Sequence, residues 1–146
     1  METSTALRSD DAPGAATAVL AARGAWRDWA RIEPGERARV IGRAAHILAA
    51  QADSIAEAIA LASGRPAAEV WSAEIVPTLD ALRWIARRGP RVLRPQALGS
   101  SWLQWYFRAG RHRLLWEPHG VVGIVTPGNS LLFLAAAQIA GALVAG

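Results

Sequence analysis

The most constraining feature of this sequence is its final stretch, from Val121 to Gly146, which contains no charged residue. An uncharged segment of that length is expected to lie either in a membrane or in a protein core. Pro127, Gly128, Asn129 and Ser130 interrupt it near its middle. Because the apolar piece on either side of the interruption is too short to cross a bilayer alone, we expect no membrane span.

The two apolar pieces differ in pattern. Residues 121–127, VVGIVTP, are rich in β-branched residues without polar alternation, which is typical of a strand buried on both faces of a parallel sheet. Residues 130–146 predict a helix that is apolar nearly all round and must therefore be buried. A parallel strand needs neighbouring strands, which this sequence does not supply. We therefore interpret the chain as the truncated opening of a βαβ unit within a larger protein.

The region before about residue 90 is predicted to be mostly helical, because its apolar residues recur at helical spacing. A first helix is expected within residues 15–32, a second from Pro34, a third near residues 53–64 and a fourth from Pro66. Ser54 and Glu57 have capping-box spacing at the start of the third helix, and Gly64 is expected to end it in a left-handed conformation. The fourth is expected to bend at Pro77 and to end at Gly89-Pro90.

The residue pattern changes after Pro95. Residues 102–116, on both sides of Ala109-Gly110, are rich in aromatic and alternating side chains. This pattern predicts two strands joined by a turn. Arginines interleaved with aromatic residues are found both at protein interfaces and at surfaces that bind single-stranded nucleic acid.

Composition excludes several kinds of chemistry. The chain has no cysteine, which excludes a disulfide framework, a thiolate zinc site and a cysteine nucleophile within these residues. The spacing of His46, His112 and His119 matches no metal-ligand pattern, so we predict no metal site. The N-terminus has neither signal-peptide nor transit-peptide features, which makes the cytoplasm the expected location.

The basic residues are all arginine, and in the last part of the chain they are not matched by acidic residues. Beyond Asp80 the only acidic residue is Glu117, against eight arginines. This imbalance favours an acidic partner for that stretch.

Residues 25–70 and 116–146 carry a resemblance to the N-terminal part of the aldehyde dehydrogenase superfamily. In that family, Glu-Pro-x-Gly-Val-Val, a short apolar run and Pro-Trp-Asn lead into a helix ending in Ala-Gly. The matching residues are Glu117, Pro118, Gly120, Val121, Val122, Pro127, Asn129 and Gly146. The sequence departs from the family where Gly128 replaces the usual tryptophan and where Ser130-Leu131 replaces the usual Phe-Pro.

The resemblance implies an incomplete α/β fold in four parts: a disordered N-terminus (1–13), N-terminal helices (14–98), an oligomerisation hairpin (99–118) and the first strand and helix of a Rossmann-like NAD(P)-binding domain (119–146). It also implies site residues. The backbone of Val125, Thr126 and Pro127 would line the nicotinamide-ribose of NAD or NADP, and Gly128 would allow close approach. Asn129 would donate its amide N–H to the oxyanion of the thiohemiacetal, and it also counts among the cofactor-binding residues.

A full-length relative would be an oxidoreductase that oxidises an aldehyde to a carboxylic acid through a cysteine thioester, as a homo-oligomer formed through residues 99–118. The family's nucleophilic cysteine and general-base glutamate are missing here, so we expect this chain alone to be inactive and to bind no cofactor. One alternative is a non-catalytic interaction module that pairs with full-length subunits. A basic nucleic-acid-binding protein is the third hypothesis, and for residues 99–118 we favour the oligomer interface over it.

Overall fold

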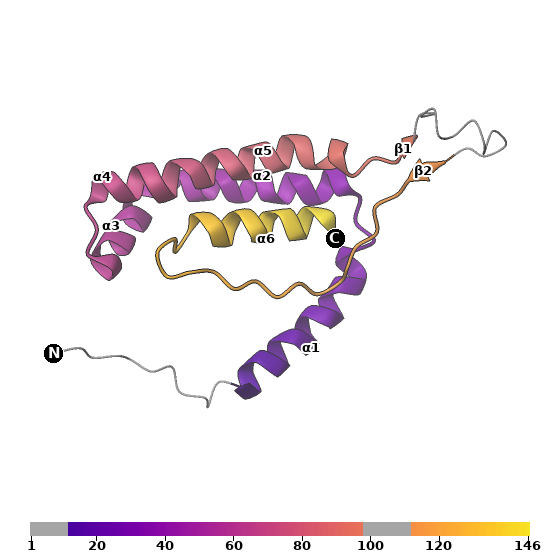
Figure 1. Ribbon diagram of the computed structural model, residues 1–146, viewed down its shortest axis with the longest axis horizontal. Coiled ribbons are helices and arrows are strands. Elements are labelled where there is room, and N and C mark those ends of the chain that lie inside the picture. The colour runs from indigo at the N-terminus through magenta and orange to yellow at the C-terminus, as the bar shows by residue number, and fades with distance from the viewer. Residues whose placement is uncertain (1–11, 98–111) are drawn as a thin grey trace, which may run out of the picture.

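The computed structural model describes residues 12–97 and 112–146. Most of the described residues are helical, and a short antiparallel sheet adds two strands (Figure 1). In chain order the elements are α1 (Ala12–Trp29), α2 (Pro34–Ala50), α3 (Ala52–Ser63), α4 (Ala67–Val70), the π-helical turn η2 (Trp71–Ile75), α5 (Val76–Val92), β1 (Gln96–Ala97), β2 (Arg113–Leu114) and α6 (Phe133–Ala145).

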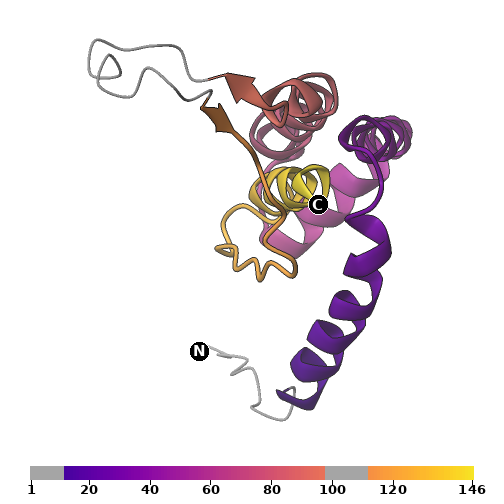
Figure 2. The same cartoon turned by 90° about the vertical axis from the view of Figure 1, so that its right-hand side faces the viewer.

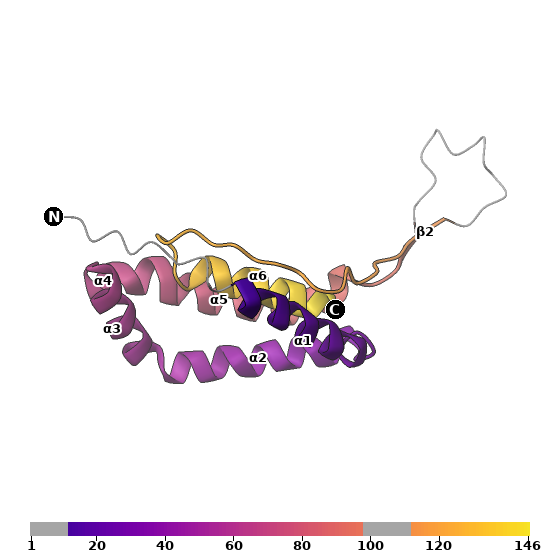
Figure 3. The ribbon, with the colours of Figure 1, turned by 90° about the horizontal axis from the view of Figure 1, so that it is seen from below.

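Helices α2, α5 and α6 form a bundle in which each packs on the other two. Figure 2 views them nearly end on and shows α1 leaving the bundle at an angle. Figure 3 shows α3 and α4 at one end of the bundle and the sheet at the other. Among the described helices, α6 is the one without a charged residue, and it packs against α2 and α5.

The core consists of two clusters of mostly small or β-branched side chains, which allow the helices to approach closely. The first cluster joins α2, α5 and α6 and contains Ala38, Ile41, Ala45, Leu82, Ala140 and Val144. The second joins α3 to α4 and η2 and contains Ala52, Ala56, Ile59, Val70 and Ile75.

Predictions for the first three helices are confirmed in outline, with one correction. Helix α1 begins at Ala12, so the N-terminal segment predicted to be disordered lies outside the described residues except for Ala12 and Pro13, which are helical. Gly64 ends α3 with a φ of 69° and donates its N–H to the Ala60 carbonyl. The predicted capping box is wrong, because Ser54 already lies inside α3 and its hydroxyl donates to the Gln51 carbonyl.

The fourth predicted helix is continuous from Ala67 to Val92 but contains the π turn η2 just before Pro77. The Val76 N–H donates to the Trp71 carbonyl, five residues back, so the turn is wider than an α-helical one. The prediction that this helix ends at Gly89-Pro90 is wrong. The helix continues to Val92, and the Leu93 N–H still reaches the Gly89 carbonyl at 3.1 Å.

Gly89 has a packing role rather than a terminating one. A Cβ atom placed on Gly89 would lie 2.8 Å from Cγ1 of Val144, a buried side chain of α6. Close approach of α5 and α6 therefore requires glycine at this position.

The strand predicted at residues 121–127 is not formed among the described residues. This segment is irregular, it belongs to no ladder, and Val125 is 94% exposed. The physical reason is that a parallel strand gains its hydrogen bonds from neighbouring strands, and no described segment lies in that position. The Rossmann-like strand remains a prediction.

The predicted hairpin falls largely on residues that the structure does not describe, including its turn at Ala109-Gly110. The sheet that is described pairs Gln96 with Leu114 and Ala97 with Arg113, antiparallel. Its first strand thus begins before residue 99, where the predicted hairpin segment starts.

The C-terminal end of α6 is bound by side chains from other helices. The indole N–H of Trp29 donates to the Leu143 carbonyl at 2.8 Å. The Arg37 guanidinium donates to the carbonyls of Val144 and Ala145, both at 3.0 Å, and Arg37 is only 4% exposed. Burial lowers the pKa of Arg37, with the nearby Glu33 acting in the opposite direction, and a guanidinium stays protonated in proteins. A cation thus lies at the negative end of the helix dipole.

The N-terminal end of α6 is bound by a carboxylate. Glu74, in η2, is 1% exposed, and one carboxylate oxygen accepts the backbone N–H groups of Leu132 at 3.1 Å and Phe133 at 2.9 Å. The other oxygen accepts from the Arg65 guanidinium at 2.9 Å. Burial by itself raises the pKa of Glu74, but the hydrogen bonds from Phe133, Leu132 and Arg65 outweigh it, so the pKa lies below its usual value. The anion therefore satisfies two N–H groups at the start of α6 that the helix itself leaves unpaired.

Substitution of Gly89 tests the packing of α5 against α6. We expect Gly89→Ala to lower the free energy of unfolding by about 1 kcal/mol, because the new methyl group displaces Val144 and this cost exceeds the gain in helix propensity. Gly24→Ala in α1 is the matched control, since no atom lies within 4 Å of its added Cβ. That variant should gain up to about 1 kcal/mol. Urea unfolding measures both, and equal stabilisation by both would contradict the close contact.

Glu74 should make stability depend on acid pH. Because its pKa is lower in the folded chain than in the unfolded chain, its contribution is full above about pH 4.5 and is lost as the pH falls through the folded-state value. Glu74→Gln should cost about 3 kcal/mol of unfolding free energy at neutral pH and should flatten the acid limb of a stability–pH curve. The matched control is Glu57→Gln, an exposed carboxylate on α3. If both variants follow the wild-type curve, Glu74 is not a buried anion.

Candidate functional site

The family-like residues 126–133 form a turn that leads into α6. The Ser130 N–H donates to the Pro127 carbonyl at 3.3 Å, and the helix starts at Phe133. In Figure 1 the segment that precedes this turn runs alongside α6 in the opposite direction and then bends back into it. The turn therefore lies at the same end of the bundle as α3 and α4.

Arg65 connects this turn to the rest of the molecule. It lies in the connection between α3 and α4, and its side chain is 21% exposed. One terminal nitrogen donates to the backbone carbonyl of Asn129 at 3.1 Å, and the other donates to the Glu74 carboxylate at 2.9 Å. The Ser130 hydroxyl adds a hydrogen bond of 3.4 Å to the same carboxylate. Arg65 and Glu74 thus fix the backbone on both sides of Ser130.

The Asn129 side chain is left available by this arrangement. Asn129 is exposed, its backbone carbonyl is held by Arg65, and no hydrogen bond of its side-chain amide occurs within the described part of the chain. An amide in that state can donate to an oxygen outside the turn. The Asn129 backbone is thus held by Arg65, while the N–H groups of its side-chain amide make no bond to another described residue.

The other sequence-predicted site residues are consecutive with Asn129 and form an open edge. Val125, Pro127 and Gly128 are exposed, and Thr126 is half-buried. No atom lies within 4 Å of a Cβ placed on Gly128, so the space beside it is open to an incoming group. These residues offer one wall of a binding site, and no described residue supplies the wall opposite.

The open N-terminus of a helix after a strand is the usual place for a dinucleotide phosphate in α/β folds. In this chain the start of α6 already holds the carboxylate of Glu74, whose negative charge would repel a phosphate. The start of α6 is therefore unsuited to a phosphate group.

An apolar groove of about 610 Å³ lies beside the C-terminal half of α6, at the other end of that helix from the turn. It is lined by α1, by residues 120–124 and by α6, with Trp26, Val122 and Leu143 among its walls. Gly120, with a φ of 93°, lies against the Trp26 ring, where an added Cβ would be 3.7 Å from a ring carbon. Gly120 is in ordinary contact with Trp26, and its positive φ is the feature that favours glycine there. The groove leaves the apolar edge of residues 121–124 open.

Sequence reasoning missed Arg65, Glu74 and Arg37, which position the ends of α6. Their partners lie far away in the chain, as for Glu74 and Phe133. A usable signal was present in Glu74, because it is a charged residue inside an apolar helical stretch, VWSAEIV. Such a residue is expected to be paired if it is buried.

No cluster of three or more histidine, cysteine or acidic residues that could bind a metal occurs in ranges 12–97 and 112–146. In the same ranges, no helix has both the length and the hydropathy needed to cross a membrane.

Comparisons with known proteins identify the family. The model of the aldehyde dehydrogenase family matches residues 2–146. The chain is 32% identical over 118 residues to 4,4'-diapolycopene aldehyde oxidase of Methylomonas sp, covering 81% of this chain and 22% of that protein. It is 34% identical over 139 residues to aminoacetaldehyde dehydrogenase of Pseudomonas aeruginosa, covering 93% and 26%. It is 30% identical over 134 residues to the NADP/NAD-dependent aldehyde dehydrogenase PuuC of Escherichia coli, covering 88% and 25%.

No solved structure matches the chain. The chain spans about a quarter of the length of the curated relatives it matches. The family match nevertheless covers the helices, the turn and α6 together. This chain belongs to the aldehyde dehydrogenase family.

Proposed function

We propose that this chain forms the N-terminal part of an NAD(P)-dependent aldehyde dehydrogenase that oxidises an aldehyde to a carboxylic acid. Family membership and the names of the relatives support the reaction class. The observation that carries the proposal is the turn at 127–132, where Arg65 and Glu74 fix the backbone and leave the Asn129 amide free.

Asn129 would supply electrostatic stabilisation of the reaction. When a cysteine thiolate adds to an aldehyde, the carbonyl oxygen becomes negatively charged. A neutral amide N–H at a fixed position stabilises that charge without a change of protonation. Loss of one such donor lowers kcat by about 10²–10³. The backbone bond from Arg65 limits the reorganisation that Asn129 would need.

Residues 125–128 would form one side of the nicotinamide-ribose site. The exposed backbone of Val125, Thr126 and Pro127 would lie along the ribose, and the open space at Gly128 would admit the ring. A bound nicotinamide would supply the hydride acceptor. The choice between NAD and NADP depends on residues outside this chain.

The chain contains no cysteine, so these residues alone lack the nucleophile and are proposed to be inactive. A complete enzyme would take an aldehyde as substrate and would assemble as a homo-oligomer through residues 99–118. The alternative, a non-catalytic module that pairs with full-length subunits, would use the same hairpin.

A chimera tests the proposed role of Asn129. Residues 12–146 of this chain would replace the matching quarter of PuuC, and NAD(P)H formation from an aldehyde would be followed by absorbance. We expect the chimera to be active, the isolated chain to be inactive, and Asn129→Ala in the chimera to lower kcat by about 10²–10³ with little change in KM.

Gln138→Ala, which removes an exposed amide from α6, is the control for that substitution. It should leave kcat unchanged. Equal activity of the Asn129 and Gln138 variants in a folded chimera would contradict the role of Asn129.

A further inference from the structure

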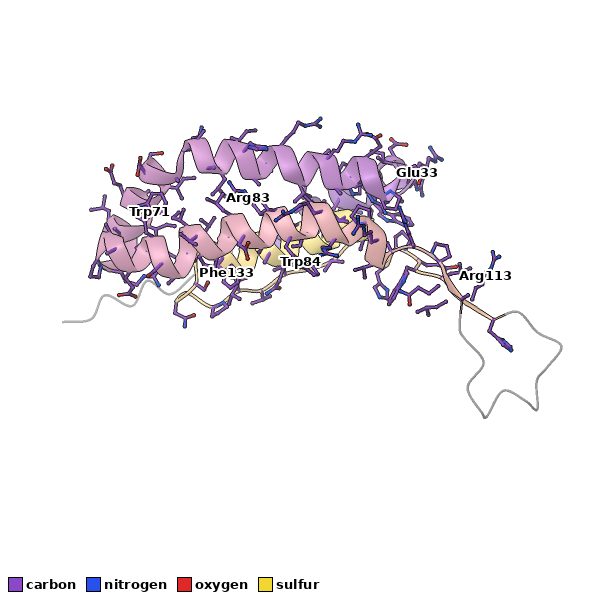
Figure 4. The ribbon with its side chains drawn as sticks, turned by 90° about the horizontal axis from the view of Figure 1, so that it is seen from above. Glu33, Trp71, Arg83, Trp84, Arg113 and Phe133 are labelled. Carbon is purple, nitrogen blue, oxygen red and sulfur yellow. The ribbon has the colours of Figure 1, made fainter. Side chains whose placement is uncertain are left out.

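The outer surface of α5 carries a group of side chains that the proposed reaction does not use. Trp84, Arg87, Arg88 and Arg91 are here called the arginine face. Arg87 and Arg88 lie three and four residues after Trp84, and Arg91 lies four and three residues after them, so all four lie on one side of the helix. They surround a hollow of about 450 Å³. Trp84, near the middle of α5 (Figure 4), is 55% exposed although it is the largest apolar side chain on this face.

Among the described residues, the charge of this face is not neutralised by ion pairs, and Asp80 is the one acidic residue of α5. Arg83, Arg87, Arg88, Arg91 and Arg94 are all exposed. Within the described ranges, none of them takes part in an ion pair, whereas Arg31, Arg39 and Arg65 all do. Among the described residues, Arg87 makes one hydrogen bond, to the Arg83 carbonyl at 3.2 Å.

The opposite side of α5 is already used for folding. Thr78 and Leu82 are buried, and Gly89 lies against Val144 of α6. The arginine face therefore has no part in the bundle core. Its arginines add mutual repulsion, which an anionic partner would relieve.

We infer that the arginine face binds an acidic segment of a partner protein. The planar guanidinium matches a carboxylate with two parallel hydrogen bonds, and tryptophan and arginine are the side chains most enriched at the energetic centres of interfaces. Arg87 and Arg91 are one helical turn apart, about 6 Å along the axis. A partner helix that carries glutamate at every fourth position presents carboxylates at the same interval.

The arginine face is less well suited to bind nucleic acid than to bind an acidic protein segment. Proteins that bind single strands stack successive bases on several aromatic side chains, and the arginine face offers one. A single large anchor surrounded by cations is the arrangement of a protein interface. The inference is independent of the proposed enzyme activity, because it involves none of residues 125–133, which contain the candidate site.

Fluorescence anisotropy of the 146-residue chain tests the inference. The probe is a fluorescein-labelled peptide with glutamate at every fourth position, and a peptide with glutamine in its place is the blank. We expect saturable binding of the glutamate peptide at about 0.15 M salt. Arg87→Gln, Arg88→Gln and Arg91→Gln together should weaken it at least about tenfold.

A control variant with the same change of net charge distinguishes binding at the arginine face from attraction by the net charge of the chain. Arg23→Gln, Arg27→Gln and Arg43→Gln together remove the same charge from exposed positions of α1 and α2 that make no ion pair in the described ranges. This variant should bind within about twofold of the wild type. Circular dichroism would establish that both triple variants stay helical.

Four results would overturn the inference. The first is the absence of saturable binding, and the second is equal weakening by the two triple variants, which would indicate attraction by net charge alone. The third is tighter binding of oligothymidylate than of the peptide at the same salt concentration, which would identify a nucleic-acid surface instead. Trp84→Ala should add a further loss of at least about fivefold to the peptide affinity, and no loss would also contradict it.

Discussion

The Glu74 carboxylate is the contact on which the arrangement of this chain depends. It lies at the π turn of the long helix and joins three separate parts of the structure: η2, the α3–α4 connection through Arg65, and the start of α6. A buried carboxylate without partners would be costly, but here its oxygens accept two backbone N–H groups, a guanidinium and a hydroxyl. Removing any of these partners leaves part of a buried charge unsatisfied.

Helix α6 shows why such a contact is needed. It has no charged residue, and the Ser130 hydroxyl just before it accepts only the Leu134 N–H among the described residues, at 3.4 Å. The N–H groups of Leu132 and Phe133 and the last carbonyls would otherwise be unpaired. Glu74 supplies an anion at the positive end of the helix dipole, and Arg37 supplies a cation at the negative end. An apolar sequence can therefore form this helix because η2 and α2 supply the charges at its two ends. The same contacts hold the turn at 127–132 in place, so the position of the candidate site depends on the position of α6. The expectation that the helix is buried nearly all round is wrong, because Ala140 and Val144 are buried whereas Ile139 is 47% and Leu143 38% exposed.

Most helices could be predicted from the sequence because their signals are local: the apolar spacing of α2, Pro34 at its start and Gly64 after α3. The extent of α5 could not, since Gly89 resembles a stop signal until its distance from Val144 is known. Residues 121–127 have the composition of a strand, but pairing depends on segments elsewhere. For the site, the family pattern identified Asn129, whereas Arg65 and Glu74 are recognisable only once η2 and α6 are brought together.

The most direct test of this account is a pH titration of the folded chain by NMR that follows the side-chain carboxyl carbon of Glu74 together with the amide protons of Leu132 and Phe133. The account predicts that the carboxyl titrates below the ordinary glutamate value and that both amide protons respond at the same midpoint. A titration of Glu74 at or above that value, with the two amides unaffected, would contradict the claim that this carboxylate holds the turn and α6 in place.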